Sequence, residues 1–182
     1  NYYYKPEKFS SFGVKLKSIA EQYNQQDPIS PLINSLYTLF LNQNYMKTFK
    51  ETGVEAYHYT ELINGIYVSS IIRYMQRDPL RNTTDLLLID DKNKLFSSND
   101  PRNEFTHDSM FTTNRSFTTE FTFQFRFKQK YYTMPHQKII SGSKYPRLNV
   151  TYKKAFPIFN TSANYDLLSA TATDDIKLGL FG

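Results

Sequence analysis

A row of alternating phenylalanines constrains the fold of this chain more than any other feature of its sequence. The row consists of Phe117, Phe121, Phe123, Phe125 and Phe127, with Thr119 at the remaining position. The residues between them are polar and include Glu120, Gln124, Arg126 and Lys128. Successive side chains of a strand point to opposite faces, so the pattern predicts a strand with one phenyl face and one polar face. Its length matches the ~9–11 residues that a tilted membrane strand needs.

The composition excludes several other classes of protein. The chain has 182 residues, of which 40% are hydrophobic and 16% aromatic, so a disordered chain is not expected. No apolar run approaches the ~20 residues of a membrane-spanning helix. The absence of cysteine excludes disulfides, zinc–thiolate sites and thiol catalysis.

The same alternation predicts further strands on both sides of the phenylalanine row. Residues 2–4 look like the end of a strand, and a second strand starts near Phe12. The Asn64-Gly65 pair predicts a type I′ hairpin turn between strands 54–62 and 66–76. Two later strands are expected near 148–153 and over 162–181, where Asp174 interrupts an otherwise apolar face.

One amphipathic helix is expected near residues 31–52. Ser30 suits the N-cap, Pro31 suits the first helical position, and Gly53 provides a C-terminal stop. Its apolar stripe most simply predicts packing in a core, although a membrane surface would also accept it. Residues 80–114 are expected to form a long polar loop, and 133–145 a connection.

Alternation also occurs in half-buried soluble sheets, so the choice of environment needs other features. Three features favour a membrane barrel: long strands after residue 110, charges on their polar faces, and aromatic residues at strand ends. We therefore expect an all-β, antiparallel transmembrane β-barrel segment of about six to seven strands. The five phenylalanines would face lipid, and Glu120, Gln124, Arg126 and Lys128 would face the lumen. Glu120 and Arg126 are expected to pair with charges on adjacent strands.

Barrels of this kind need at least ~8 strands to close. Residues 1–182 are accordingly expected to be part of a single outer-membrane barrel domain that is truncated at both ends. Parity of the strands and the length of the loops favour an extracellular position for the helix.

Several segments also resemble a known family. They are the run from Asp27 to Asn34, the run from Glu61 to Gly65, residues 79–85 and residues 142–148. Together they resemble the C-terminal barrel of a Bacteroidota-type family of outer-membrane proteins of unknown function. Members of that family typically begin with a sandwich domain that is similar to the regulatory domain of carboxypeptidases. The resemblance implies a bacterial outer-membrane location and a role in envelope assembly or solute transport, and it transfers no catalytic residue.

No catalytic or metal-binding pattern is present. The three histidines, His58, His107 and His136, do not have the spacing of metal ligands. The acidic pairs Asp90-Asp91 and Asp174-Asp175 are most simply solvated, and neighbours in a strand point to opposite faces. We therefore expect no enzyme activity, no metal and no cofactor.

The net charge of +5 raises the question of which anionic partners the chain could contact. Lysine and arginine among aromatic residues can bind nucleic acid, but no recognition motif accompanies them here. A barrel lumen or the phosphates of lipopolysaccharide explain the charge with fewer assumptions. The expected partners are outer-membrane lipid, lipopolysaccharide and other outer-membrane complex subunits, with no nucleic acid.

The leading hypothesis is a non-enzymatic outer-membrane β-barrel protein with a structural, transport or assembly role. A second hypothesis is a fragment of a TonB-dependent nutrient receptor barrel. A third is a soluble β-rich surface or binding domain, which would remain in the aqueous phase without detergent.

Overall fold

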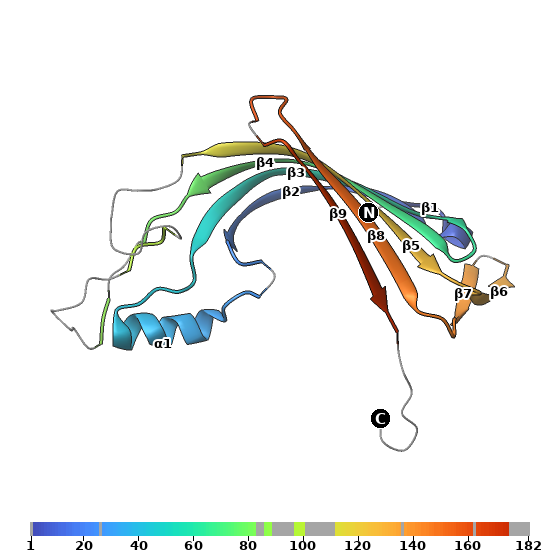
Figure 1. Ribbon diagram of the computed structural model, residues 1–182, viewed down its shortest axis with the longest axis horizontal. Coiled ribbons are helices and arrows are strands. Elements are labelled where there is room, and N and C mark those ends of the chain that lie inside the picture. The colour runs from blue at the N-terminus through green and yellow to red at the C-terminus, as the bar shows by residue number, and fades with distance from the viewer. Residues whose placement is uncertain are drawn as a thin grey trace, which may run out of the picture. The chain divides into compact units, whose positions relative to one another are not determined.

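One antiparallel sheet dominates the fold (Figure 1). The computed structural model describes residues 2–25, 27–82, 86–88, 97–100, 112–135, 137–161 and 163–174. The strands are β1 (Tyr2–Lys5), β2 (Ser10–Gln22), β3 (Thr48–Ile63), β4 (Ile66–Pro79), β5 (Asn114–Arg126), β6 (Lys130–Met134), β7 (Gln137–Gly142), β8 (Arg147–Phe156) and β9 (Tyr165–Thr173). A short 3-10 turn, η1 (Pro6–Lys8), follows β1, and the helix α1 (Pro31–Leu41) precedes β3.

The order of the strands follows the chain with one insertion. The seven-stranded sheet has the order β1-β2-β3-β4-β5-β8-β9, and β6 pairs only with β7. The pairs β1–β2, β5–β8 and β8–β9 are antiparallel. The predicted antiparallel β architecture is therefore confirmed. In the described residues the sheet is not closed, because β1 and β9 are its two edges.

The chain divides into two compact units. Unit 1 comprises Asn1–Leu16, Val54–Tyr74 and Ser116–Gly182, and unit 2 comprises Lys17–Gly53 and Met75–Arg115.

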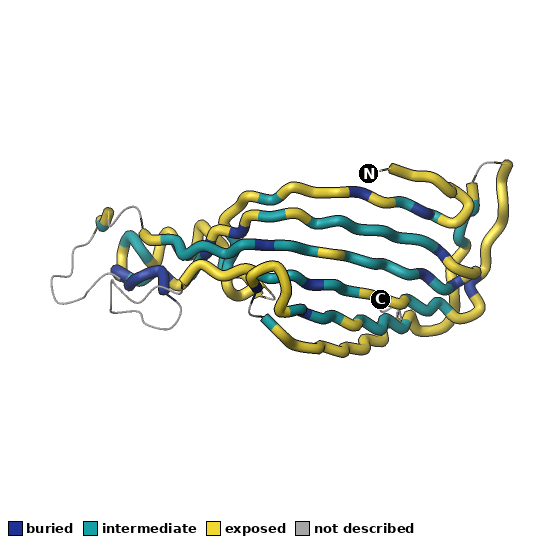
Figure 2. Tube along the Cα trace, turned by 90° about the horizontal axis from the view of Figure 1, so that it is seen from above, coloured by how far each residue is buried: buried dark blue, intermediate teal, exposed yellow. Residues whose placement is uncertain are grey.

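Few apolar side chains are buried in the sheet. Figure 2 shows strands that are mostly exposed or intermediate along their length. In the described part of the chain, the buried apolar side chains are Phe49, Tyr67, Met75 and Ala155. A sheet of a soluble domain normally covers one face with a second layer of structure. Here the described residues provide little such cover.

The hairpin turn lies where the sequence predicted it, but its type differs. β3 ends at Ile63 and β4 begins at Ile66, so Asn64 and Gly65 are the turn residues. Gly65 has a φ of +83°, whereas Asn64 is not among the residues with positive φ. A type I′ turn needs positive φ at both central positions, so that part of the prediction was wrong.

The helix is shorter than predicted, and its apolar stripe does not lie in a core. It ends at Leu41, where Asn42 adopts the left-handed conformation (φ 60°), and residues 48–53 belong to β3. The one buried helical residue is Asn34. Its side-chain oxygen accepts hydrogen bonds from the backbone N–H groups of Tyr45 and Met46 at 2.9 and 2.8 Å. A polar contact therefore orients the helix. The apolar side chains that remain exposed are Leu32, Ile33, Leu36, Tyr37, Phe40 and Leu41.

The connection expected at 133–145 contains the end of β6 and all of β7. β9 covers Tyr165–Thr173, and the remainder of the strand predicted to residue 181 lies outside the described residues beyond Asp174. Most of the predicted loop over 80–114 lies outside them as well.

Candidate functional site

The two faces of β5 form the candidate functional site, because the sequence predicts different surroundings for them. Phe121 and Phe123 are 39% and 40% exposed, while Phe117 and Phe125 are half-buried. Thr118, on the opposite face, is only 6% exposed. The phenyl face of this strand is therefore the less covered of the two.

Phe127 and Lys128 do not belong to this strand. β5 ends at Arg126, and Lys128 has a φ of +49° in the turn that follows. The Nζ atom of Lys128 lies 5.1 Å from the centre of the Tyr145 ring. Strand alternation therefore does not assign a face to either residue, and their predicted faces stay predictions.

β8 and β9 continue the phenyl face in register. Phe121 lies opposite Tyr152, and Phe123 lies opposite Val150. The third row pairs Phe125 with Leu148. The β9 residues that extend these three rows are Leu168, Ala170 and Ala172. Three neighbouring strands of unit 1 thus present one shared apolar face.

The opposite face of the same strands carries matched polar pairs. The hydroxyls of Thr122 and Thr151 lie 2.9 Å apart. The side-chain amide of Gln124 donates to the side-chain oxygen of Asn149 at 3.0 Å. Directly opposed polar pairs of this kind contribute roughly 0.2–1 kcal/mol each in a sheet. These two rows of the polar face therefore pair their side chains within the protein.

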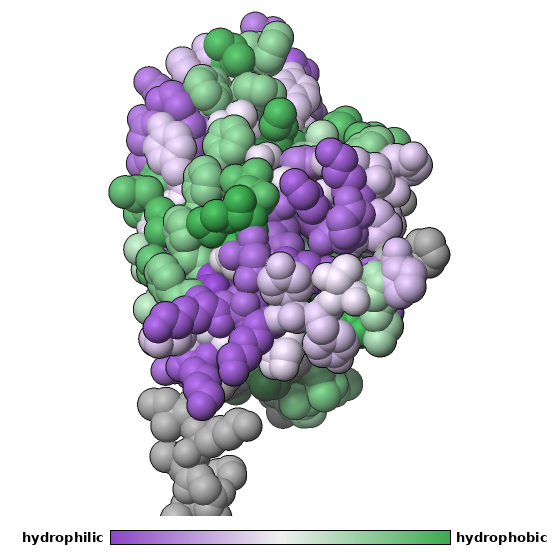
Figure 3. Space-filling view, turned by 90° about the vertical axis from the view of Figure 1, so that its right-hand side faces the viewer, coloured by the Kyte–Doolittle hydropathy of each residue, from purple (hydrophilic) through white to green (hydrophobic). Residues whose placement is uncertain are grey.

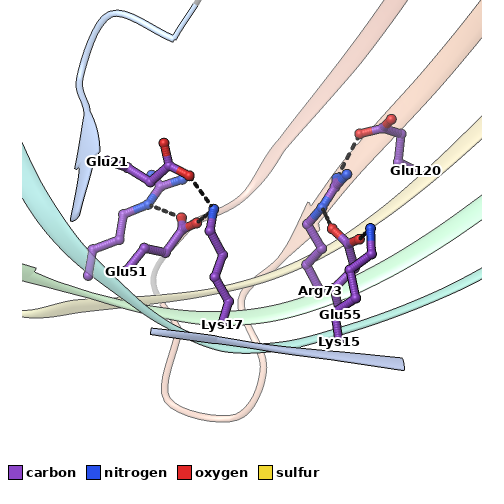
Figure 4. A network of polar contacts seen from close by, with 8 residues as sticks. Lys15, Lys17, Glu21, Glu51, Glu55, Arg73 and Glu120 are labelled. Carbon is purple, nitrogen blue, oxygen red and sulfur yellow. Dashed lines mark hydrogen bonds and ion pairs between the residues drawn. The ribbon is translucent and has the colours of Figure 1, made fainter. Parts of the chain in front are cut away.

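A four-residue ion network crosses this polar face (Figure 4). Arg73 on β4 lies between two carboxylates, with its Nε 2.7 Å from Glu55 and a terminal nitrogen 2.9 Å from Glu120. Lys15 lies 3.3 Å from the other oxygen of Glu55. The prediction that Glu120 pairs with a charge on an adjacent strand is confirmed, because β4 neighbours β5.

Arg126 has different partners from those predicted. Its Nε donates to the side-chain oxygen of Gln124 at 3.2 Å, and its guanidinium lies 5.0 Å from the centre of the Tyr67 ring. Within the described ranges it forms no ion pair with a carboxylate. A cation–π contact stabilises a partly desolvated guanidinium by about 1 kcal/mol or more.

A second polar cluster of unit 1 lies beside the β3–β4 turn. Lys138 on β7 contacts Glu61 at 2.5 Å, and their side chains are 9% and 3% exposed. Gln129 donates to Glu61 at 3.2 Å and accepts from the Tyr67 hydroxyl at 3.0 Å. The backbone N–H of Gly65 also donates to Glu61 at 3.1 Å. Each partner of this buried carboxylate is therefore a donor, as burial of a charge requires.

Unit 2 contains its own ion cluster, centred on Glu51. Its two oxygens lie 2.6 Å from Lys17 and 3.1 Å from Arg77, and Lys17 also lies 2.6 Å from Glu21. Burial disfavours the ionised carboxylate, but hydrogen bonds from Lys17 and Arg77 outweigh it and lower the pKa of Glu51 below its ordinary value of 4.5.

The spacing of charged residues in the sequence indicates these clusters. Glu51, Glu55 and Glu61 are separated by even numbers of residues, and so are Arg73 and Arg77. Even spacing within an extended strand places side chains on one face. The spacing alone therefore predicts an acidic row on β3 and a basic pair on β4.

No cluster of metal-binding side chains is found in the described residues. They contain no group of three His, Asp or Glu side chains able to hold a metal ion. His58 shares a hydrogen bond of 2.7 Å with the Tyr4 hydroxyl. His107, His136, Asp175 and the Asp90-Asp91 pair lie outside the described residues. None of the helices described here has the length and hydropathy to cross a membrane.

Comparison with known proteins gives one match. A family model described as "Family of unknown function (DUF5686) C-terminal domain" matches residues 1–182. No curated protein and no solved structure matches the chain.

Proposed function

Because this chain belongs to the family of unknown function described as the DUF5686 C-terminal domain, whose description assigns no activity, we propose a function from the faces of its sheet. In this proposal, the chain forms part of a non-enzymatic β-barrel in the bacterial outer membrane. The phenyl face of β5 contacts lipid, and the polar face lines the interior. The role of such a barrel lies in transport, envelope assembly or structure.

The observation that carries the proposal is the inverted burial of the two faces. In a soluble antiparallel sheet the apolar face is covered and the polar face meets water. In unit 1 Phe121, Phe123 and Tyr152 are exposed. The opposite face carries polar groups that are paired within the protein, such as Thr122 with Thr151 and Glu120 with Arg73. Figure 3 shows hydrophobic and hydrophilic side chains gathered in separate areas of the surface. Large exposed apolar areas on soluble monomers are rare and mark interaction or membrane sites.

The length of the strands supports the same assignment. β5 has 13 residues. At about 3.3 Å per residue and a tilt of about 40°, such a strand advances about 30 Å along the membrane normal. The hydrocarbon core of a bilayer is about as thick.

We assign the membrane-crossing segments to unit 1. They are residues 54–63, 66–74, 116–126, 147–156 and 165–173. Each is close to the ~9–11 residues that a tilted strand needs to cross. The parts of β2, β3 and β4 that belong to unit 2, including the cluster around Glu51, are not among these segments.

In this proposal further strands complete the barrel. The edge strands β1 and β9 present unpaired backbone groups, and those of β9, which we assign to the membrane, cost several kcal/mol each in hydrocarbon. A single-chain bacterial barrel also needs at least ~8 strands, more than the seven of this sheet. The free edges are therefore the places where additional strands pair.

Fluorescence quenching from the lipid phase tests the proposal directly. Residues 1–182 contain no cysteine, so single variants Phe123→Cys and Thr122→Cys can each carry one environment-sensitive label once any cysteine outside these residues is replaced by serine. In the full-length protein in vesicles, a quencher attached to lipid tails should quench the label at position 123. The label at 122, one residue away on the other face, should be quenched much less.

Two outcomes would contradict the proposal. Equal quenching at both positions would show that the faces are assigned wrongly. Recovery of the unlabelled full-length protein in the aqueous phase without detergent would favour a soluble surface domain.

A further inference from the structure

The polar face of β5 and β8 ends in a pair of like charges. Arg126 lies directly opposite Arg147 in the register of the two strands. The rows before it are complementary, with the Thr122 and Gln124 side chains each hydrogen-bonded to the residue opposite. Like charges directly opposite each other destabilise a sheet. This row therefore differs from its neighbours, because its two side chains cannot pair with each other.

A cavity of 220 Å³ lies beside this row within unit 1. Among the described residues that line it, the charged ones are Arg126, Lys144, Arg147 and Asp174. Three cations against one carboxylate leave an excess positive charge. Neither Lys144 nor Arg147 forms an ion pair within the part of the chain that the structure describes. The lining also places Asp174, the residue that interrupts the apolar pattern of the last strand, beside a positively charged cavity.

Neighbouring contacts hold the lining in place. The backbone N–H of Arg126 donates to the Gly65 carbonyl at 2.7 Å, in addition to the contact of its guanidinium with Tyr67. In the 143–147 segment, the Ser143 hydroxyl accepts a hydrogen bond from the backbone N–H of Tyr145 at 3.1 Å. The cations are therefore presented on anchored backbone, which lowers the entropy lost on binding a ligand.

We propose that this cavity binds a phosphate group. Guanidinium groups match the geometry of phosphate oxygens with two parallel hydrogen bonds, and Lys144 adds a point charge. The volume is below the ~300 Å³ at which cavities for drug-sized ligands begin, so it suits a small anionic group. A bound phosphate would also neutralise the repulsion between Arg126 and Arg147.

A phosphate group reaches such a site from two sources, a lipid headgroup or a soluble phosphate. Two measurements on the full-length protein distinguish them. Calorimetric titration with inorganic phosphate in detergent, at constant ionic strength, measures the soluble source. Lipid retained after extraction from phosphatidylcholine vesicles with and without phosphatidylglycerol, counted by native mass spectrometry, measures the headgroup source.

The informative variant is Arg147→Gln, because Arg147 is exposed and its loss breaks no described ion pair or hydrogen bond. Loss of one charge-assisted contact should weaken phosphate binding by about tenfold or more. Lys144→Gln provides a second variant in case the first does not fold. The matched control is Arg81→Gln, which removes one exposed positive charge from unit 2 and does not touch this cavity.

Each outcome either supports or overturns the proposed phosphate site. Binding of inorganic phosphate that depends on Arg147 supports a site for soluble phosphate, and Arg147-dependent retention of phosphatidylglycerol supports a headgroup site. Absence of binding in both measurements would overturn the inference, as would equal binding by the Arg147→Gln and Arg81→Gln variants. The inorganic-phosphate measurement does not require membrane insertion, so its failure is distinguishable from failure of the proposed function.

Discussion

The two faces of β5 differ in what stabilises them, although their residues alternate along one strand. Phe123 is 40% exposed and lies in a row with Val150, with no described layer above it. Thr122, its neighbour, is hydrogen-bonded to Thr151. The polar face is stabilised by partners within the protein, because an unpaired polar group away from water is costly. The apolar face instead depends on the solvent that meets it, which in our proposal is lipid.

The largest expected loss of unfolding free energy comes from breaking the Glu61–Lys138 ion pair beside the β3–β4 turn. Lys138→Met removes the cation next to buried Glu61 and leaves that carboxylate without a charge partner. Breaking a buried pair in this way costs about 3–5 kcal/mol of unfolding free energy. Urea titration of the full-length protein in vesicles measures it.

The double variant Glu61→Gln/Lys138→Met is the control, because it removes both charges and should recover part of the loss. A single variant as stable as the wild type would show that pairing contributes little there.

The next largest effect tests the apolar face. Phe123→Arg places a charge in the row that we assign to lipid, and should lower the unfolding free energy in vesicles by about 2–4 kcal/mol. Thr122→Arg loses one hydrogen bond and should cost about 1 kcal/mol, since the polar face accepts charge. A larger loss at 122 than at 123 would reverse the comparison.

A substitution in the β3–β4 turn should change stability independently of the phase that meets either face of the sheet. Gly65 has a φ of +83°, and a Cβ there would lie 2.4 Å from the carbonyl oxygen of Arg126. Gly65→Ala should therefore lower the unfolding free energy by about 1–3 kcal/mol through strain alone. The loss should be similar in detergent and in vesicles, whereas that of Phe123→Arg should depend on the surrounding phase. A Gly65→Ala variant of unchanged stability would show that the turn relaxes.

The smallest effect concerns the ion cluster of unit 2, which is centred on Glu51. The pKa of Glu51 is lowered below 4.5 by Lys17 and Arg77, so the folded state binds its proton less readily than the unfolded state. Its stabilising contribution is complete above about pH 4.5 and is lost as the pH falls through the lowered pKa. The wild type should lose stability in that acidic range, and Glu51→Gln should lose less. Identical pH profiles would contradict the role of this cluster.

Local patterns predicted much of the fold. The alternation around Phe123 placed β5 and its two faces, and Asn64-Gly65 placed the hairpin turn, because both signals depend on backbone geometry within a few residues. Prediction was wrong where a turn ended an element earlier than its local pattern indicates. The helix was extended towards Gly53, although the left-handed Asn42 ends it. Lys128 was assigned to a strand, although the chain turns before it.

Contacts between distant residues were not predictable in the same way. The sequence indicated that Glu120 needs a cation, but the identity of Arg73, 47 residues away, depends on which strands become neighbours. The opposition of Arg126 and Arg147 likewise depends on the register of β5 against β8. A shift of one residue in that register would exchange the faces.

The sequence by itself determined that the chain forms two-faced strands, because side-chain alternation is a property of any extended backbone. Only the tertiary structure decided which charges meet, that the helix is held through Asn34, and that three cations surround one small cavity. These features arise from pairings over long sequence separations, and such pairings are chosen by the free energy of the whole sheet.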